Sequence, residues 1–546
     1  VIELEPGLSE DEALAAADRV AAKLRSIEAP EVLVGGQLLA EREFADIAVK
    51  DAVRGEAIAL VVLLVVLILF GRSLVAGVLP LVVALVTIAG ALLVLRVLAG
   101  AVAVSEFAVN VVTLLGLGLA VDYSLLMLAR FREERVADPD APLADLLART
   151  TAGAGRAVLV SGLAVAIALA GLAVFADRLL SAMALGGVLA VALATLTGLT
   201  LTPALIAVAH RRIPGPRDRG PGLLARLAAF AQRRPIPVAL VVTAALLALS
   251  VPALGLDVAN ADARSLPETS EARRVYEIVQ RDFSKGSIQP MVVLIDASPK
   301  PDGSFPVSLR TLTRDITDGG PMTGLPPGLA GLELDPAGPD SGERAQALVR
   351  AIRDLDPRLR VGGPAAELVD AKDSTADRLP LALAVIVLPT ALLLFALTRS
   401  ALIPLKALVM NALTLGATLG VLMLVFDGPL DITTPLLLFM LIFGLSMDYE
   451  VFLLSRIKEE HDRGAANAVL SGITATGPVV TTAAIAIGVV FLGFALGTLG
   501  EVREIGIGMA VAVLLDVTVV RGLLLPATMT ILGRWNWWPG ARESPR

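Results

Sequence analysis

The chain of 546 residues contains no cysteine, which excludes disulfides, thiolate metal sites and a thiol nucleophile. It has only two histidines, His210 and His461, and both stand in charged segments beside apolar runs, where we expect solvated side chains rather than metal ligands. So few histidines leave no Ser/His/Asp arrangement, and no glycine-rich phosphate-binding pattern occurs. We therefore expect no enzyme activity, no cofactor, no metal and no direct use of ATP.

Hydrophobic residues, by contrast, make up 55% of the sequence, and they gather in runs long enough to cross a bilayer. The net charge of −7 says little, because the distribution of Lys and Arg decides orientation. The fold class is therefore a polytopic α-helical membrane protein. Eleven spans are predicted: Ala57–Phe70, Leu74–Leu98, Phe107–Ala129, Ala157–Phe175, Met183–Ala209, Ile236–Leu254, Leu381–Leu397, Ile403–Phe426, Pro435–Ser455, Val479–Leu496 and Ile505–Leu532.

Two related stretches show that the chain is internally duplicated. Gly118–Glu134 and Gly444–Glu460 share eight of seventeen residues at an offset of 326. A second repeat pairs a helix over Ser9–Ile27 and a strand over Glu31–Val34 with a helix after Gly342 and a strand ending at Gly363. The offset predicts about 90 residues before Val1, with a twelfth span, so we expect an N-terminally truncated sequence.

The basic segment 211–235 sets the expected topology. It holds seven arginines and one acidic residue, Asp218, so the positive-inside bias makes it cytoplasmic. The expected order is the end of a first outer domain (1–55), five spans (56–210), this loop (211–235), one span (236–255), an outer α+β domain (256–376), five spans (377–532) and a cytoplasmic tail (533–546).

Each copy of the repeated stretch carries an aspartate inside a span, Asp122 and Asp448, and each is followed by a tyrosine, Tyr123 and Tyr449. A carboxylate at membrane depth is costly and by default indicates a functional site. Gly118 and Gly444 lie four residues earlier on the same helix faces and allow close packing with another helix. We expect the two sites to meet near the pseudo-symmetry axis and relay protons. The alternative is that each aspartate is neutral and only holds helices together.

Asp516, Arg521 and Glu450 are further charged residues in the second set of spans. Asp516 and Arg521 are secondary candidates for the proton path, although five residues on an α-helix separate them by about 140°, which predicts no local ion pair. Arg521 is expected to snorkel toward the cytoplasm. Glu450, whose counterpart is Ser124, is expected at the lipid interface or in helix packing.

These stretches resemble the MMPL (mycobacterial membrane protein large) transporters of the resistance-nodulation-division superfamily. The resemblance rests on the two Gly-Leu-x-x-Asp-Tyr motifs, on the Val-Gly-Gly returns ending at Gly36 and Gly363, and on Leu515–Arg521. It implies twelve spans in the cell membrane, extracytoplasmic porter domains after the first and seventh, and proton-driven export of lipids or other hydrophobic molecules. It also implies that Asp122 pairs with Tyr449 and Asp448 with Tyr123. The partners are then cargo, protons and membrane lipids, not nucleic acid, and a homo-oligomer or accessory proteins are left open.

Two other classes compete with this interpretation. An intramembrane aspartyl protease also uses two membrane carboxylates, and Pro203-Ala204-Leu205 is similar to one of its signatures, but its Gly-x-Gly-Asp is absent because Gly116 and Gly118 lie too far before Asp122. The other is a non-enzymatic accessory or regulatory protein, such as a protein-export accessory or a sterol-sensing-like regulator.

Overall fold

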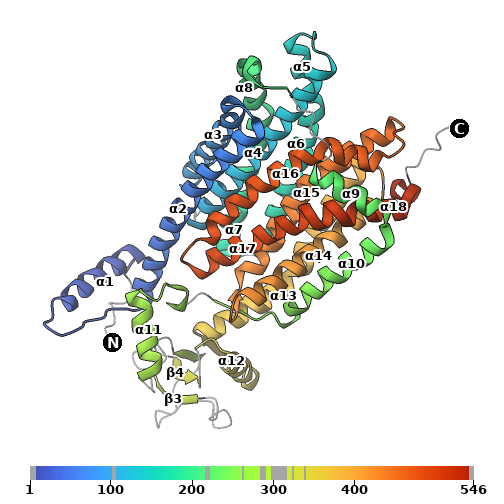
Figure 1. Ribbon diagram of the computed structural model, residues 1–546. Helices are drawn as coiled ribbons and strands as arrows, with labels where there is room; N and C mark the ends of the chain where they lie inside the picture. The colour runs from blue at the N-terminus through green and yellow to red at the C-terminus, as the bar shows by residue number, and fades with distance from the viewer. Residues whose placement is uncertain are drawn as a thin grey trace. The chain divides into compact units, whose positions relative to one another are not determined.

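The computed structural model describes residues 8–100, 106–175, 177–215, 222–260, 263–282, 290–296, 316–322, 325–326, 328–336 and 340–539. The chain forms two compact units (Figure 1). One comprises residues 51–257, 378–497 and 502–546 and is called the membrane unit below. The other comprises residues 1–50, 258–377 and 498–501 and is called the soluble unit.

The described residues contain eleven helical spans that are long and apolar enough to cross a membrane, which confirms the number predicted from the sequence. The first set is Gln37–Gly71 (α2), Leu74–Leu98 (α3), Ala108–Ala137 within Glu106–Ala137 (α4), Leu143–Phe175 and Arg178–Arg212. The others are Pro235–Gly255, Pro364–Thr398 (α13), Leu402–Val425 (α14), Thr433–Asp462 (α15), Ala468–Ala495 (α16) and Gly500–Trp537.

Several spans are built from more than one helix. Leu143–Phe175 consists of α5 (Leu143–Thr150), a π-helical turn (Thr151–Gly155), α6 (Arg156–Ala170) and a 3₁₀ turn (Gly171–Phe175). The next consists of α7 (Arg178–Leu199), α8 (Leu201–Ala209) and a 3₁₀ turn (His210–Arg212), and α10 (Pro235–Ser250) continues into Val251–Gly255. The last consists of α17 (Gly500–Leu514), a π-helix (Leu515–Leu524), α18 (Leu525–Leu532) and a 3₁₀ turn (Gly533–Trp537), while α9 (Leu223–Arg233) is a short amphipathic helix.

The two halves repeat the same backbone details. The turn between α2 and α3 places Arg72 at φ 56°, and Arg399, 327 residues later, has φ 55° in the turn between α13 and α14. Positive φ is uncommon for a non-glycine residue, so finding it at equivalent turns supports the duplication.

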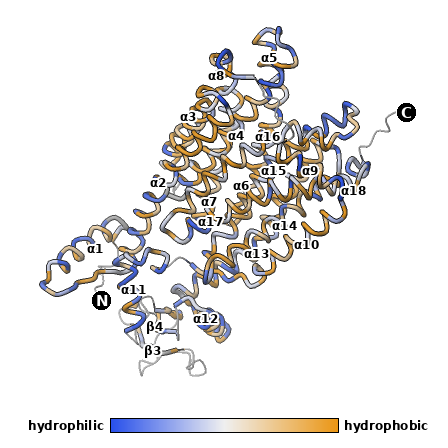
Figure 2. The backbone as a smooth tube through the Cα atoms, viewed as in Figure 1, coloured by the Kyte–Doolittle hydropathy of each residue, from blue (hydrophilic) through white to orange (hydrophobic). Residues whose placement is uncertain are grey.

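The motif-bearing helices lie at the centre of the membrane unit. In their most apolar stretches, 89% of the α4 span and 83% of the α15 span are buried, against 17% for Pro235–Gly255. Helix α4 packs against α3, α7 and α16, and α15 packs against α6, α14 and α16. Hydrophobic residues cover these helices along most of their length (Figure 2). The outer helices expose apolar side chains, as expected where lipid is the solvent.

In the soluble unit, four antiparallel strands form a sheet with the order β3-β4-β2-β5. They are β2 (Met291–Asp296), β3 (Ile316–Pro321), β4 (Leu329–Pro336) and β5 (Leu359–Gly362). Alternate residues Met291, Val293 and Ile295 of β2 are buried, as the two-residue period of a strand requires. They share a core with α12 (Glu343–Leu355), and α11 (Glu271–Asp282) completes the helices on this stretch of chain. The short strand β1 (Val258–Ala259) and a 3₁₀ turn (Ala263–Ser265) also belong to this unit, whereas the short strand β6 (Leu430–Asp431) belongs to the membrane unit.

The first outer segment agrees with its prediction only in part. Helix α1 (Glu10–Arg25) confirms the helix expected over Ser9–Ile27, and it begins at a capping box formed by Ser9 and Glu12. The strand expected over Glu31–Val34 is wrong, because these residues pair with no strand in the part of the chain that the structure describes. Instead the Val34 amide donates to the Glu271 carboxylate at 2.8 Å, so a side chain accepts the hydrogen bond that a neighbouring strand would accept in a sheet.

Candidate functional site

Asp122 on α4 and Asp448 on α15 are both buried, with 5% and 6% of their surfaces exposed. The Tyr449 hydroxyl donates to Asp122 Oδ2 at 2.8 Å. This hydrogen bond joins the two halves of the chain, 327 residues apart, in the middle of the membrane unit. The geometry is therefore the Asp122–Tyr449 pairing that the family resemblance implies.

The second pairing is different. In the described part of the chain, Tyr123 makes no direct hydrogen bond to Asp448; its hydroxyl lies 3.3 Å from Ser161 Oγ, and the Ser161 hydroxyl donates to Asp448 Oδ1. The direct Asp448–Tyr123 pair implied by the resemblance is thus corrected to a pair bridged by a serine of α6.

The two glycines explain how the helices come close enough. A Cβ atom on Gly118 would lie 3.3 Å from Ile487 on α16, and one on Gly444 would lie 3.2 Å from Val165 on α6. Each glycine therefore contacts a helix from the other half of the chain, as expected where small residues let two helices pack closely.

The same contacts show why the two sites differ. Val165 and Ile487 occupy equivalent positions and are 322 residues apart, and this separation places Ala483 where α6 has Ser161. Ala483 is buried but has no hydroxyl to insert between an aspartate and a tyrosine. The direct bond at Asp122 and the bridged one at Asp448 therefore follow from one serine-to-alanine difference between repeats.

The prediction that Asp516 and Arg521 make no local ion pair is wrong. Arg521 Nε lies 2.8 Å from Asp516 Oδ2, because Leu515–Leu524 is a π-helix. In that helix the backbone bonds run from i to i+5, so residues five apart lie on nearly the same face. Nor does Arg521 snorkel: it is 3% exposed, bonds the Ser446 carbonyl, and lies over the Tyr449 ring at 5.6 Å.

Sequence reasoning missed three small polar residues of this cluster. Besides Ser161, they are Ser446, whose hydroxyl lies 3.0 Å from Asp516 Oδ1, and Asn411 on α14, whose Oδ1 lies 2.6 Å from the same hydroxyl. The available signal was a buried Ser or Asn inside an apolar span. In lipid such side chains must find partners within the protein, which singles them out from the surrounding aliphatic residues.

Four buried atoms of the cluster have no hydrogen-bond partner among the described residues: Asp122 Oδ1, Asp448 Oδ2, Asn411 Nδ2 and one terminal nitrogen of Arg521. Asp122 and Asp448 thus each accept hydrogen bonds with one carboxylate oxygen, while the other oxygen has no partner among the described residues. A free carboxylate oxygen can take up a proton without first breaking the bond that the other oxygen accepts.

Glu450 lies inside the bundle and not at the lipid interface, which corrects one of its two expected positions. Only 5% of it is exposed, and its charge interacts with Lys406 on α14 and with Arg521. Its counterpart Ser124 bonds Thr202 at 3.2 Å instead. The second half therefore holds charged groups where the first holds hydroxyls.

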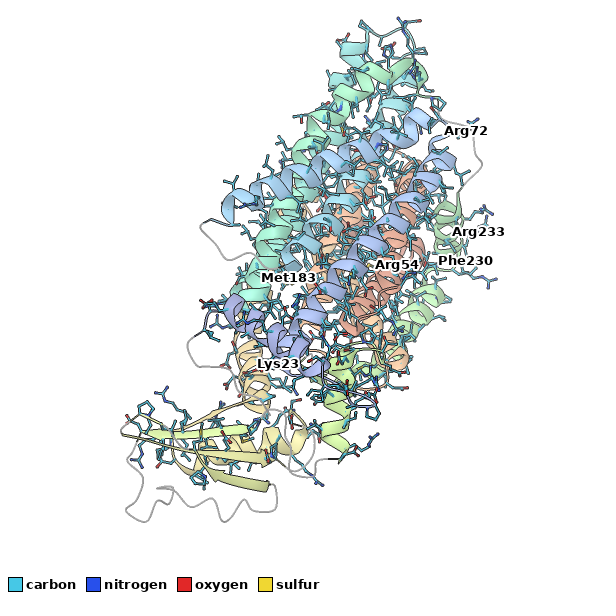
Figure 3. All side chains as sticks on the ribbon, turned by 90° about the vertical axis from the view of Figure 1, so that its left-hand side faces the viewer. Lys23, Arg54, Arg72, Met183, Phe230 and Arg233 are labelled. Atoms are coloured by element: carbon cyan, nitrogen blue, oxygen red, sulfur yellow. The ribbon has the colours of Figure 1, made fainter. Side chains whose placement is uncertain are left out.

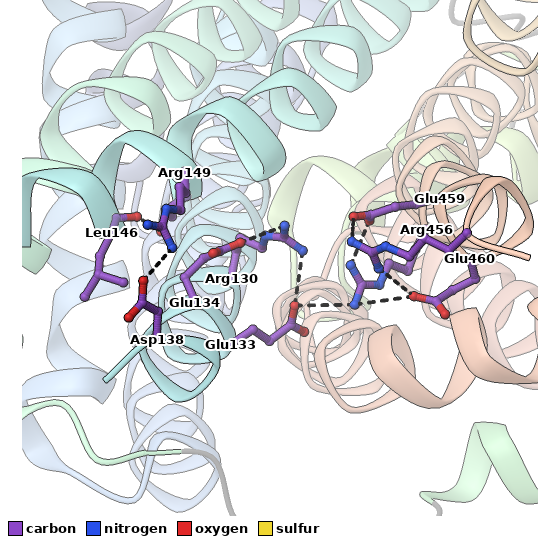
Figure 4. A network of polar contacts seen from close by, with 11 residues as sticks. Arg130, Glu133, Glu134, Asp138, Leu146, Arg149, Arg456, Glu459 and Glu460 are labelled. Carbon is purple, nitrogen blue, oxygen red and sulfur yellow. Dashed lines mark hydrogen bonds and ion pairs between the residues drawn. The ribbon is translucent and has the colours of Figure 1, made fainter. Parts of the chain in front are cut away.

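A network of ion pairs lies at the C-terminal ends of α4 and α15 (Figure 4). Arg130 pairs with Glu134 at 2.7 Å, and the equivalent Arg456 pairs with Glu459 at 2.7 Å. Arg456 also lies 3.9 Å from Glu133, a contact between halves. Among the described residues, no group of three or more His, Asp or Glu side chains is placed to hold a metal ion.

These observations define a polytopic membrane protein of two related halves with a buried carboxylate cluster between them. The profile of the MMPL family matches residues 1–238 and 329–546, and the chain belongs to that family. It is 41% identical to the membrane protein SCO6666 of Streptomyces coelicolor, over 98% of this chain and 78% of that one.

Two mycobacterial relatives are more distant. The chain is 31% identical to the mycolic acid-containing lipids exporter MmpL11 of Mycolicibacterium smegmatis, over 88% of this chain and 54% of that one. It is 28% identical to the trehalose monomycolate exporter MmpL3 of the same organism, over 97% and 59%. The chain thus spans little more than half of these two exporters.

Among solved structures, SecDF of Thermus thermophilus, a translocon-associated membrane protein, has a TM-score of 0.58 over 88% of this chain and 62% of that one. At 15% sequence identity this likeness shows the shared fold alone. It adds no support to the protein-export alternative.

Proposed function

We propose that this protein exports lipids or other hydrophobic molecules across the membrane and that proton uptake at Asp122 and Asp448 drives the export. The observation that carries the proposal is the 2.8 Å bond from Tyr449 to Asp122, which couples a buried carboxylate of one half to a hydroxyl of the other. Lipid export is what the two relatives from Mycolicibacterium smegmatis, MmpL3 and MmpL11, are named for.

The chemistry requires two states of the same cluster. A charged carboxylate only accepts hydrogen bonds, whereas a protonated one also donates. Protonation of Asp122 or Asp448 therefore changes the hydrogen bonds that Tyr449, Ser161 and Arg521 can make. Because these side chains come from different helices, exchanging partners favours a different packing of α4 against α15 and α16. Asp516 and Arg521 extend the path as secondary members.

The proposed topology keeps the basic segment 211–235 in the cytoplasm and the domain of residues 256–376 outside the cell membrane. Residues 1–55 then contribute to the first porter domain and residues 256–376 form the second. This arrangement would let energy taken up in the membrane unit act on cargo held by the soluble unit. Homo-oligomers and accessory proteins are compatible with it.

The test is proton flux through the full chain in liposomes that hold a pH-sensitive dye, after an imposed pH difference. Asp122→Asn and Asp448→Asn should each abolish the protein-dependent flux. Asp462→Asn is the control, since this exposed carboxylate pairs with Lys458 at the end of α15, away from Asp122 and Asp448. Unchanged flux in both site variants would contradict proton coupling.

If flux is lost, a second measurement addresses the cargo. A fluorescent phospholipid placed in one leaflet should reach the other side of the membrane faster with wild-type protein and a pH difference than without the difference. Proton flux with no lipid movement would keep the coupling and refute lipid as the cargo.

A further inference from the structure

Five arginines gather at one end of the first half, and the carboxylate cluster makes no use of them. They come from three segments of chain: Arg72 from the turn between α2 and α3, Arg132 and Arg135 from the end of α4, and Arg211 and Arg212 from the 3₁₀ turn after α8. They are called the arginine cluster below.

Hydrogen bonds hold these three segments together. Arg132 donates to the Gly71 carbonyl at 3.0 Å, beside Arg72. Arg135 donates to the carbonyls of His210 at 3.0 Å and Ile213 at 2.7 Å, on either side of Arg211 and Arg212. The Ser73 hydroxyl donates to the Arg212 carbonyl at 3.1 Å, which closes the ring of contacts.

The positive charge of the cluster is not neutralised by the described part of the chain, where none of its members has an ion-pair partner. The nearest carboxylates of α4 are engaged elsewhere: Glu134 with Arg130, Glu133 with Arg130 and Arg456, and Asp138 with Arg149. Backbone carbonyls satisfy N–H groups but carry no net charge. Arg132 Nε is buried and has no hydrogen-bond partner among the described residues.

Exposed apolar side chains adjoin the cluster along the same helices. Leu69 of α2 is 66% exposed, Leu74 of α3 is 64% exposed, and Val208 of α8 is 86% exposed. In a membrane protein such side chains face the acyl chains. Each lies within four residues of an arginine of the cluster, so the arginine cluster directly adjoins exposed apolar side chains.

At the equivalent end of the second half, the basic side chains have partners within the chain itself. The counterparts of Arg132 and Arg135, at the offset of 326, are Lys458 and His461. Lys458 pairs with Asp462 at 3.1 Å and lies over the Trp537 ring, and His461 stacks on the same ring at 4.5 Å. The fold therefore does not require an uncompensated basic cluster at this place.

We propose that the arginine cluster binds the phosphate headgroup of an anionic phospholipid, whose acyl chains lie along Leu69, Leu74 and Val208. A phospholipid matches both features, because its headgroup carries negative charge and its acyl chains cover exposed apolar side chains, whereas inorganic phosphate would use the charge alone. Basic pockets between membrane helices at the cytoplasmic side are the places where anionic headgroups bind.

The experiment measures phosphatidylglycerol binding to the full chain in detergent, by the rise in its unfolding temperature and by native mass spectrometry. Arg211→Gln/Arg212→Gln should weaken the binding by roughly 25-fold, about 5-fold for each arginine near an anionic surface. Arg132 and Arg135 are kept, because they hold the helix ends.

The matched control is Arg233→Gln/Arg234→Gln, which removes the same charge from an adjacent exposed pair of the same basic segment. Figure 3 places Arg233 on α9 and Arg72 at the α2–α3 turn. The control should bind phosphatidylglycerol as the wild type does. Arg72→Gln, with a loss of about 5-fold, serves as the second variant if the double one fails to fold.

Two further ligands test whether binding requires an anionic lipid or only a phosphate group. Phosphatidylcholine, which is zwitterionic, should bind equally weakly to all variants, and inorganic phosphate should not raise the unfolding temperature. The proposal is overturned if both double variants lose binding equally, if phosphatidylcholine binds as tightly as phosphatidylglycerol, or if inorganic phosphate gives the same stabilisation.

Discussion

Replacing each tyrosine of the site by phenylalanine should have unequal effects, although the two motifs look alike in sequence. Tyr449 donates to a carboxylate at 2.8 Å, whereas Tyr123 lies 3.3 Å from the neutral hydroxyl of Ser161. Tyr449→Phe also leaves Asp122 without any partner, because its other oxygen already has none among the described residues. Tyr123→Phe leaves Asp448 bonded to Ser161.

The bond energies set the expected sizes. A hydrogen bond to a charged group contributes about 1.5–3 kcal/mol, so losing it from one state of the proposed transport cycle should slow proton flux roughly 10- to 150-fold. A neutral hydrogen bond contributes about 0.5–1.5 kcal/mol, and a long one less, so Tyr123→Phe should slow flux roughly 2- to 10-fold.

The assay is the initial rate of dye-reported proton flux in liposomes, per folded protein, for both variants and for Ser161→Ala. Tyr123 and Ser161 belong to one bridge, so the double variant Tyr123→Phe/Ser161→Ala should be little worse than Ser161→Ala alone. Equal losses for the two tyrosines, or a larger loss for Tyr123→Phe, would refute the inference that Ser161 makes the two halves unequal.

Three further predictions concern stability. Gly118→Val should destabilise the protein by about 1–3 kcal/mol in detergent, because its side chain overpacks against α16. Asp516→Asn and Arg521→Gln should each cost about 3–5 kcal/mol by leaving one buried partner unpaired, while the double variant costs less than their sum. Burial raises the pKa of Glu271, but bonds from Arg25 and Val34 lower it further, so the net pKa is below its ordinary value. The local stability from Glu271 is therefore complete above pH 4.5 and lost as the pH falls through the folded-state pKa; it is absent in Glu271→Gln at every pH.

Each of these has its own control. Gly488→Val on α16 adds the same side chain where a Cβ meets no atom within 4 Å, and it should be tolerated. Strict additivity of the Asp516 and Arg521 variants in chemical unfolding would contradict a coupled pair. For Glu271, a spin label at position 28 of the cysteine-free chain should become mobile on acidification in the wild type only; a label equally mobile at pH 7 in both proteins would count against the bond.

The sequence alone was enough to identify the eleven spans, the duplication and the two Asp-Tyr motifs. Spans are readable because lipid requires long apolar helices, and a carboxylate inside one stands out against that background. The family resemblance and the strand and helix of the second outer domain come from the same kind of local pattern. None of these depends on knowing which helix packs against which.

Partners and helix type, by contrast, depend on packing across the chain. The 140° argument for Asp516 and Arg521 assumed an α-helix, and only the folded structure shows the π-helix that brings them together. Ser161 became part of the site because α6 crosses α15 at Gly444, a contact between residues nearly 300 positions apart that no local pattern contains.

Glu31–Val34 illustrates the same division at the level of a strand. The repeat pairs it with β5, yet a strand needs a neighbouring strand, and here a glutamate side chain accepts the hydrogen bond of the amide that a neighbouring strand would have used. Composition sets what a segment can form, because propensity and hydrophobicity are local. The partner that satisfies each polar group is chosen by the whole fold, since burial makes an unsatisfied group too costly to keep.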